Sequence, residues 1–269
     1  MVRAAVAGIA GRMGTRIAQL ILESEGIELV GGFERADHPK VGKDLGEIIG
    51  GSPLGIVASA SIRDVLDRAD VVIDFTNASV SLNHLQAASS AKKPMVIGST
   101  GFTAEQTAQA RELAGKVPCV LAPNMSMGVN VLFKVVADVA RLLGDGFDVE
   151  IVEAHHRYKK DAPSGTALKL AQVVADALGR DLDKTGVYTR HGLIGERTGQ
   201  EIGVQTVRAG DIVGEHTVIF GGLGERIELI HRAHSRDNFA RGAVRAALWV
   251  TGQAPGLYDM QHVLGISAS

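Results

Sequence analysis

Short apolar runs alternate with helical stripes along the first half of the chain. Positions 2–7 form the first run, and Met13, Ile17, Leu20 and Ile21 follow it at helical spacing. Further strand-like runs lie at 28–33, 71–75, 95–98 and 120–122, with helical stretches expected at 79–91 and from about residue 103. This alternation predicts an α/β fold with a doubly wound parallel sheet, whose ligand binds at the carboxyl ends of the strands.

The second half of the chain has a different pattern. Three segments alternate apolar and polar positions and mostly lack helices between them, at 203–208, 213–220 and 225–232. They predict an α+β region with a mixed or antiparallel sheet that has one covered face, and an open face of this kind suits a subunit interface. Helices are expected at 131–143, on a stripe of Leu168, Ala171, Ala175 and Leu178, and from Asp237 onward.

A glycine-rich turn joins the first strand to the first helix, with glycines at positions 8, 11 and 14. Glycines at such a turn allow tight bending, close approach of the backbone to a pyrophosphate, and close packing of helix on strand. The second strand ends in Glu34, 20 residues after Gly14, where an acidic side chain can bind the ribose of NADH. Arg35 follows at once and could meet the 2′-phosphate of NADPH, so both cofactors stay open. The turn predicts a Rossmann-type domain.

The change of pattern predicts two domains. Residues 1–126 plus 237–269 are expected to form the dinucleotide-binding domain, and residues 127–236 the substrate-binding and oligomerisation domain. The chain would cross between the two near residues 127 and 237. A closing segment at 258–264 is expected to pack back on the first domain.

A basic segment begins where the apolar run 149–152 ends. It places five potentially cationic side chains within six positions: His155, His156, Arg157, Lys159 and Lys160. The residues at 163–166, Pro-Ser-Gly-Thr, then open a helix, with the proline expected in its first turn. Unpaired N–H groups and the helix dipole attract anions there, so the segment predicts a site for a small polyanion such as a dicarboxylate. A solvated basic loop with a simple helix cap is the alternative.

Composition narrows the class of protein. The chain has 269 residues, a net charge of −2 and a pI of about 6.5, which favour neither nucleic acid nor an anionic membrane as partner. Cys119 is the single cysteine, so an internal disulfide is excluded and a reducing compartment is expected. The sequence shows neither a leading signal segment nor an apolar run of about 18 residues, so neither export nor a membrane span is predicted, and the cytoplasm is the expected location. The histidines form no metal-binding motif, so no metal site is predicted.

Taken together, these stretches resemble the 4-hydroxy-tetrahydrodipicolinate reductase (dihydrodipicolinate reductase) family of the diaminopimelate–lysine pathway. The likeness runs nearly end to end and rests on residues 8–14, 74–76, 98–102, 124–130 and 153–166, with support from 208–216. The histidine- and lysine-containing segment that ends in Pro-Ser-Gly-Thr is highly specific to the family. Three positions depart from the usual family pattern, namely Ala10, Tyr158 and Lys160.

The resemblance implies an NAD(P)H-dependent oxidoreductase that reduces 4-hydroxy-tetrahydrodipicolinate to tetrahydrodipicolinate, usually as a homotetramer. The cofactor would bind at Gly8, Ile9, Ala10, Gly11, Arg12, Met13, Glu34, Arg35, Gly98, Ser99, Thr100, Ala122, Pro123, Asn124 and Met125. The substrate carboxylates would bind at His156, Lys159, Ser164, Gly165 and Thr166. The proton donor would be His155, assisted by Lys159.

Two alternatives stay open at this stage. One is another two-domain dehydrogenase of an amino-acid pathway, of the aspartate or homoserine type, against which the basic segment speaks. The other is a non-catalytic dinucleotide sensor, which the fold alone does not exclude. A sensor would bind the dinucleotide but would have no use for His155 and Lys159.

Overall fold

The computed structural model describes residues 1–266 and divides them into two compact units. One unit combines residues 1–127 with the segment from 237 onward, and the other is the continuous segment 128–236. The chain therefore leaves the first unit, forms the second and returns. Within the described residues, no helix is both long and apolar enough to cross a membrane.

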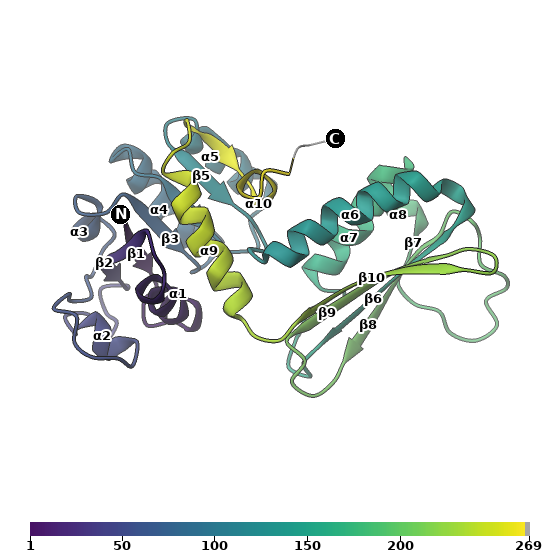
Figure 1. Ribbon diagram of the computed structural model, residues 1–269, viewed down its shortest axis with the longest axis horizontal. Helices are drawn as coiled ribbons and strands as arrows, with labels where there is room; N and C mark the ends of the chain where they lie inside the picture. The colour runs from purple at the N-terminus through teal and green to yellow at the C-terminus, as the bar shows by residue number, and fades with distance from the viewer. Residues whose placement is uncertain (267–269) are drawn as a thin grey trace. The chain divides into compact units, whose positions relative to one another are not determined.

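The first unit is built around a six-stranded sheet whose neighbouring strands are all parallel (Figure 1). The strand order is β11-β5-β4-β3-β1-β2, and the strands are β1 Val2–Ala7, β2 Ile27–Phe33, β3 Val71–Asp74, β4 Met95–Ile97, β5 Pro118–Leu121 and β11 Gly256–Tyr258. The order reverses beside β1, and the carboxyl ends of β1 and β3 flank this point. In open α/β sheets that is where ligands bind.

Helices cover both faces of this sheet, which confirms the predicted doubly wound fold. Alternate residues of β1 supply the two cores, with Ala4 and Val6 on one face and Ala5 and Ala7 on the other. The first face packs against α1 Arg12–Glu23, α9 Asp237–Val250 and α10 Met260–Val263, with α2 Leu45–Ile48 beside them. The second face packs against α3 Arg63–Leu66, α4 Ala78–Ser90 and α5 Ala104–Ala114.

The second unit contains a five-stranded mixed sheet with helices on one face (Figure 1). Its order is β10-β9-β6-β8-β7, and the strands are β6 Asp148–His155, β7 Gly186–Val187, β8 Ile202–Arg208, β9 Gly214–Gly221 and β10 Arg226–Ala233. Strand β6 runs parallel to β8 and antiparallel to β9. The helices are α6 Met127–Leu143, the 3-10 turn η1 Gly144–Gly146, α7 Gly165–Leu178 and α8 Leu182–Thr185. The mixed sheet with one covered face is as predicted.

Three local expectations need correction. Helix α6 begins at Met127 rather than 131, because Val129 and Asn130 are already buried and extend its packed face. Leu168 is 39% exposed, and the buried stripe of α7 runs instead through Ala167, Leu170, Ala171, Val174 and Ala175. Pro163 lies before the N-cap residue Ser164 and not in the first turn.

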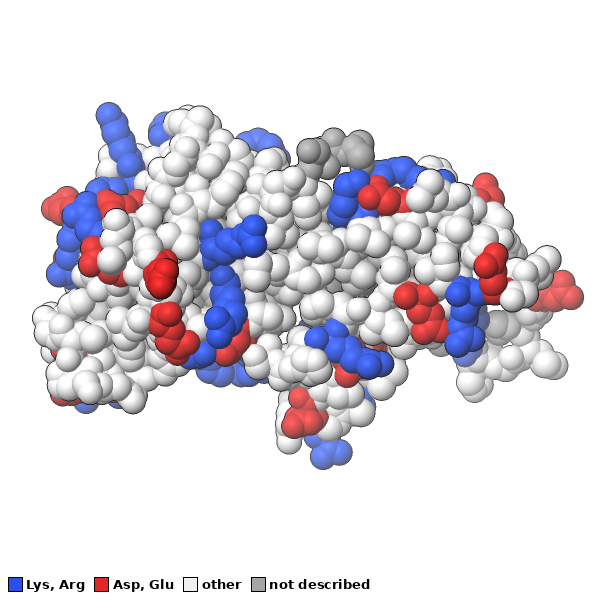
Figure 2. Space-filling view, viewed as in Figure 1, with Lys and Arg blue, Asp and Glu red and all other residues white. Residues whose placement is uncertain are grey.

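Charged side chains of both signs are interspersed on the face shown in Figure 2, without a broad region of one sign. This distribution agrees with the net charge of −2. On this face, therefore, no single sign of charge dominates.

Candidate active site

The glycine turn after β1 makes the start of α1 open to an anion. Gly8 has a φ of +61°, and a Cβ added at Gly14 would lie 2.0 Å from the Gly8 carbonyl oxygen, so both positions require glycine. Gly11 caps α1 without a side-chain hydrogen bond, and the first turn of the helix carries no acidic residue. The first N–H groups of α1 are therefore directed at the turn, as pyrophosphate binding requires.

The end of β2 lies against the same turn. Glu34 Oε1 accepts a hydrogen bond of 2.9 Å from the Ala10 backbone N–H. Its carboxylate thus supports the turn and still has a second oxygen for a ribose hydroxyl. Arg35 is exposed and pairs with Asp37 at 3.0 Å, which leaves it free to reorient toward a phosphate because a surface ion pair of this kind is weak.

A pocket of about 430 Å³ brings Gly8, Glu34 and Arg35 together with residues of α4 and of the loop between β3 and α4. Its polar wall includes His84, whose Nδ1 lies 2.6 Å from Oδ2 of the buried Asp74. The other lining residues are Phe33, Ala60, Ser61, Ile62, Arg63, Thr76, Asn77, Val80, Asn83 and Ala87. The pocket lies at the carboxyl ends of β1 and β3, where the strand order reverses, and it is large enough for part of a dinucleotide.

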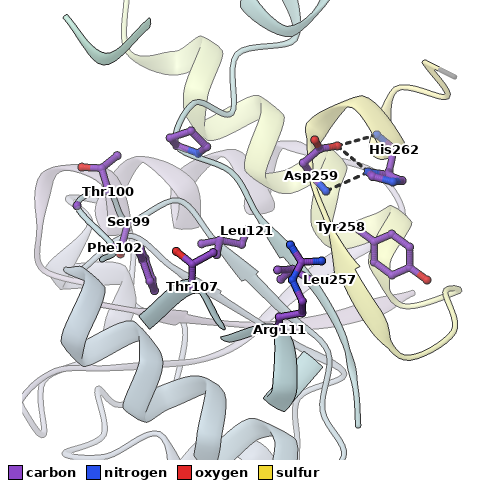
Figure 3. Close-up of a pocket in the computed structure, with 12 residues that line it drawn as sticks. Ser99, Thr100, Phe102, Thr107, Arg111, Leu121, Leu257, Tyr258, Asp259 and His262 are labelled. Atoms are coloured by element: carbon purple, nitrogen blue, oxygen red, sulfur yellow. Dashed lines mark hydrogen bonds and ion pairs between the residues drawn. The ribbon is translucent and has the colours of Figure 1, made fainter. Parts of the chain in front are cut away.

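A second pocket of about 500 Å³ contains Ser99, Thr100 and Pro123 from the expected cofactor set (Figure 3). Arg111 of α5 also lines this pocket, and so do Asp259 and His262, which form a hydrogen-bonded pair. Gly98 precedes these loops, and a Cβ there would lie 2.2 Å from the Phe75 ring. This pocket adds a mixed polar and apolar surface at the ends of β4 and β5.

The remaining expected cofactor residues differ in accessibility. Ile9, Ala122 and Met125 are buried, so they can offer a ligand only their backbone groups. Arg12 is exposed, Met13 is partly buried, and Asn124 Oδ1 accepts a hydrogen bond from the Ser126 N–H. The open helix start, the glycine turn and the acid at the end of β2 together fit a nicotinamide dinucleotide.

In the second unit, Glu153 and His155 end strand β6 on the face that the helices cover. Residues two apart on a strand point to the same side, and here Val149 and Ile151 of the core are followed by Glu153 and His155. The Glu153 side chain is fully buried. Its Oε2 lies 2.6 Å from His155 Nδ1.

Glu153 is also held from β8 and from the loop before α7. Arg208 binds it through the two terminal guanidinium nitrogens, Nη1 to Oε2 and Nη2 to Oε1, each at 2.8 Å. Oε1 further accepts the Ser164 backbone N–H at 2.9 Å and the Thr206 hydroxyl at 3.3 Å. The pairing of β6 with β8 explains these contacts, since Glu153 lies opposite Thr206 and His155 opposite Arg208.

Strand β9 supplies a second histidine to the same cluster. His216 is 4% exposed and lies opposite Glu153 in the register, with its ring centroid 5.3 Å from that of His155. Its Nε2 is 3.1 Å from Ser164 Oγ, which also accepts the Ala167 N–H and so caps α7. The Ser164 N–H is already used by Glu153, so this helix start has fewer donors for an anion than the sequence suggested.

The other expected substrate residues lie on the loop between β6 and α7 and at the start of α7. Lys159 is partly buried and pairs with Asp161 at 2.9 Å. His156 lies next to Tyr158, with a ring separation of 6.3 Å. Gly165 is exposed at the first helical position and Thr166 follows it, partly buried. The segment therefore carries two histidines and a lysine, and Glu153 links one of them, His155, to the Ser164 cap of α7.

The charges within the cluster are set by burial and by hydrogen bonds. Burial alone would raise the pKa of Glu153, but the hydrogen bonds from Arg208, His155 and Ser164 outweigh it and lower this pKa to about 2. Burial lowers the pKa of His155, and Glu153 opposes that effect. Burial, together with the nearby His155, lowers the pKa of His216 to about 3. At neutral pH the cluster holds one carboxylate, one guanidinium and a neutral His216.

Two models of one protein family match nearly the whole chain. Residues 2–125 match the model of the N-terminus of dihydrodipicolinate reductase, and residues 128–264 match that of its C-terminus. A 4-hydroxy-tetrahydrodipicolinate reductase of Syntrophobacter fumaroxidans is 71% identical over 266 residues, which are 99% of this chain and 100% of that protein. The corresponding reductase of Syntrophus aciditrophicus is 61% identical over 265 residues, 98% of this chain and 99% of that protein.

The chain belongs to the dihydrodipicolinate reductase family. It is an NAD(P)H-dependent oxidoreductase whose reaction, the reduction of 4-hydroxy-tetrahydrodipicolinate, is a step of lysine and diaminopimelate biosynthesis. This result displaces the aspartate- or homoserine-type dehydrogenase and the non-catalytic sensor. Among solved structures, a dipicolinate-bound dihydrodipicolinate reductase from a Paenisporosarcina species has a TM-score of 0.75 and 28% identity, covering 96% of this chain and 97% of that chain.

Sequence reasoning about this reductase missed the buried part of the cluster. Glu153, Thr206, Arg208 and His216 were given no role, although three of them lie in stretches that carry the family likeness. The two-residue spacing of Glu153 and His155 after an apolar run was a signal that both point to one side. Among residues 1–266 of the reductase, no group of three or more His, Cys, Asp or Glu side chains is placed to hold a metal ion.

Proposed function

We propose that His155 donates the proton in the reductase reaction and that Lys159 and the start of α7 bind the substrate. The observation that carries this proposal is the 2.6 Å contact of His155 Nδ1 with the buried Glu153, beside the Ser164 cap of α7. Burial lowers the pKa of His155, but the contact with Glu153 favours the charged ring, and the charged ring can give its proton to a carbon that needs one. The 4-hydroxyl group leaves as water to give a conjugated ring, the hydride adds to an electrophilic carbon of that ring, and the resulting enamine then takes the proton.

The cofactor is proposed to be held by the first unit. NADPH or NADH supplies the hydride when it is bound. The N–H groups at the start of α1 would bind its pyrophosphate, Glu34 would bind a ribose hydroxyl, and Arg35 would bind the 2′-phosphate of NADPH. The proposed contacts are Gly8, Ile9, Ala10, Gly11, Arg12, Met13, Glu34, Arg35, Gly98, Ser99, Thr100, Ala122, Pro123, Asn124 and Met125, with Ile9, Ala122 and Met125 contributing backbone groups.

The substrate is proposed to be a dicarboxylate heterocycle. The Paenisporosarcina reductase binds dipicolinate, which supports a site for two carboxylates on one ring. One carboxylate would meet the Ser164 hydroxyl and the N–H groups of Gly165 and Thr166. Lys159 would leave Asp161 to meet the substrate, and His156 would add a further donor. Lys159 and the helix dipole would also stabilise charge that develops during the transfer.

A homotetramer in the cytoplasm is the assembly that we propose. The uncovered face of the second unit's sheet carries apolar side chains, and Val207 and Ile230 are 42% and 47% exposed. An open sheet face that carries exposed apolar side chains beside ion pairs, such as Glu215 with Arg232, is suited to association with another copy of the chain. Cys119 is a free buried thiol whose pKa is raised by burial to about 12, so it is inert and compatible with a reducing compartment.

The test is a rate measurement with freshly generated 4-hydroxy-tetrahydrodipicolinate, following the absorbance of NADPH and, separately, of NADH. Changing His155→Ala is expected to lower kcat by about 10²–10⁴-fold, because general acid catalysis contributes that much. KM is expected to change little, since the proton transfer is made in the transition state. Lys159→Ala is expected to raise KM as well as lower kcat.

His191→Ala is the matched control because this histidine is exposed in the same unit and lies outside the cluster. It is expected to leave both constants unchanged. A His155→Ala enzyme that keeps its kcat, or that loses only affinity, would show that another group donates the proton. The ratio of the rates with the two cofactors would show whether Glu34 or Arg35 dominates cofactor choice.

A further inference from the structure

We propose that Glu153, clamped by Arg208, is the positioning residue of this active site: it directs the transferable proton to Nε2 of His155 and ties that ring to the substrate-binding start of α7. This inference rests on the proposed role of His155 as proton donor. Glu153 itself is buried and reaches the reaction only through its neighbours.

The first step concerns the position of the proton on the ring. An ionised carboxylate can only accept hydrogen bonds, so the 2.6 Å contact requires Nδ1 of His155 to carry a hydrogen. A neutral histidine ring has a single N–H group, and the contact with Glu153 places that hydrogen on Nδ1. The charged ring also carries this hydrogen on Nδ1, with a second one on Nε2. The proton that His155 takes up and releases is therefore the one on Nε2.

The second step concerns the rigidity of the carboxylate. Two parallel hydrogen bonds from Arg208, at 2.8 Å each, fix the plane of the Glu153 carboxylate. Arg208 is in turn held by the Asp161 carbonyl oxygen at 2.6 Å, on the loop that carries Lys159. Because Arg208 of β8 fixes the carboxylate, the orientation of the His155 ring that is hydrogen-bonded to it is fixed as well.

The third step links the proton donor to the substrate site. Glu153 Oε1 accepts the Ser164 N–H at 2.9 Å while Oε2 accepts His155. Ser164 is the N-cap of α7 and the proposed ligand of a substrate carboxylate. One buried carboxylate thus sets the distance between the acid and the anion-binding turn, which is the alignment that proton transfer requires.

The titration of His155 depends on every charged neighbour that faces it. Glu153 on its own strand favours the protonated ring. Arg208 from β8 and Lys159 from the loop oppose it, with Asp161 paired to Lys159. His216 from β9 faces the ring, and His231 of β10 lies opposite His216. Glu153 is the only one of these groups that is both ionised and hydrogen-bonded to the ring, so its removal has the largest effect.

The test is the pH dependence of kcat in the full-length enzyme. The rate falls as pH rises through the pKa of His155, because only the charged ring can donate from Nε2. Glu153→Gln keeps the shape of the side chain but removes the negative charge, which lowers that pKa. The falling limb of the profile is expected to move to lower pH by about one unit or more. A purely structural role would lower the amount of active enzyme without moving this limb.

Glu150→Gln is the matched control. Glu150 lies on the same strand and is also bound by an arginine through two contacts of 2.8 Å, from Arg190, but it points to the other side of the sheet. Its limb is expected to coincide with that of the wild type. A folded Glu153→Gln enzyme whose limb also coincides with the wild type overturns the proposal.

A second measurement protects the test if Glu153→Gln does not fold. Glu153→Asp keeps the charge but places it farther from the His155 ring. We therefore expect a smaller shift of the falling limb of the pH profile to lower pH, and the absence of any shift would overturn the proposal. Histidine ¹⁵N spectra at high pH are expected to show His155 with its hydrogen on Nδ1, and a hydrogen on Nε2 overturns it. A fully active His155→Ala enzyme would contradict the proposed role of His155 as proton donor. An inactive His155→Ala enzyme, together with a Glu153→Gln profile that coincides with the wild type, would contradict only the positioning role of Glu153.

Discussion

Gly214 of β9 decides how closely the His155 ring can lie on the sheet. A Cβ added at this position would lie 3.0 Å from His155 Nε2, which is tighter than ordinary van der Waals contact. Nε2 is the atom proposed to release the proton. The absence of a side chain at Gly214 is therefore a condition for the ring orientation that Glu153 imposes from the other side.

Gly214→Ala is expected to lower kcat by about 10- to 100-fold, because a displaced acid loses its alignment with the substrate. Far-ultraviolet circular dichroism checks the fold, and steady-state kinetics with the hydroxylated substrate measures the loss. Gly221→Ala, at the end of the same strand, has open space around the added Cβ and is expected to behave as wild type. Equal kcat values for the two variants would show that the absence of a side chain at Gly214 does not matter for the orientation of His155.

At the scale of elements, α9 depends on one glycine to reach the sheet of the first unit. It contributes several buried alanines to the core, and Gly242 lies among them. A Cβ at Gly242 would lie 1.8 Å from the Met125 carbonyl oxygen. The helix backbone is in effect packed directly on the segment that follows β5.

Gly242→Ala is expected to destabilise the protein although alanine is the better helix former by about 1 kcal/mol. The clash with a backbone atom forces the helix outward, and overpacking of this kind costs about 1–3 kcal/mol or more. Thermal unfolding should show a Tm lower by at least about 2–4 °C. Arg241→Ala, on the exposed side of α9, is the control; a Gly242→Ala enzyme as stable as this variant would contradict the packing argument.

The helices and strands with a strong apolar periodicity could be predicted from the sequence, whereas short elements without such a pattern could not. Strand β1 and helix α1 have clear apolar patterns, and the glycine turn between them has its own spacing. Strand β11 has only three residues, and it becomes a strand because β5 offers it an edge. Glu153 shows the same limit for the site, since its partner Arg208 is 55 positions away and only the parallel register of β6 and β8 brings them together.

At the scale of the whole molecule, the buried histidine makes stability depend on pH. His216 has its pKa lowered from 6.5 to about 3, mainly by burial. Below pH 6.5, His216 therefore binds a proton in the unfolded chain but not in the folded chain. The free energy of unfolding decreases as pH falls from 6.5 toward 3. Glu153, with its pKa lowered from 4.5 to about 2, adds a further loss between these two values.

Wild-type enzyme is expected to lose about 2 kcal/mol of unfolding free energy through His216 between pH 7 and pH 5. His216→Asn cannot titrate, so the unfolding free energy of this variant should fall much less over the same interval. Urea unfolding followed by far-ultraviolet circular dichroism measures both. His191→Asn, an exposed position, should retain the wild-type slope. Parallel slopes for the wild type and His216→Asn would refute the assignment.

The discontinuous first unit has a consequence for how the protein is made. Residues 1–127 leave the ribosome first, but one face of their sheet waits for Ala240, Ala243 and Ala247 of α9, which are synthesised more than 100 residues later. Residues 128–236 form one continuous unit, and every residue of its buried core lies within it. Since domains fold as units during synthesis, the second unit is expected to mature before the first, and the nascent first half exposes apolar surface until the C-terminal segment returns.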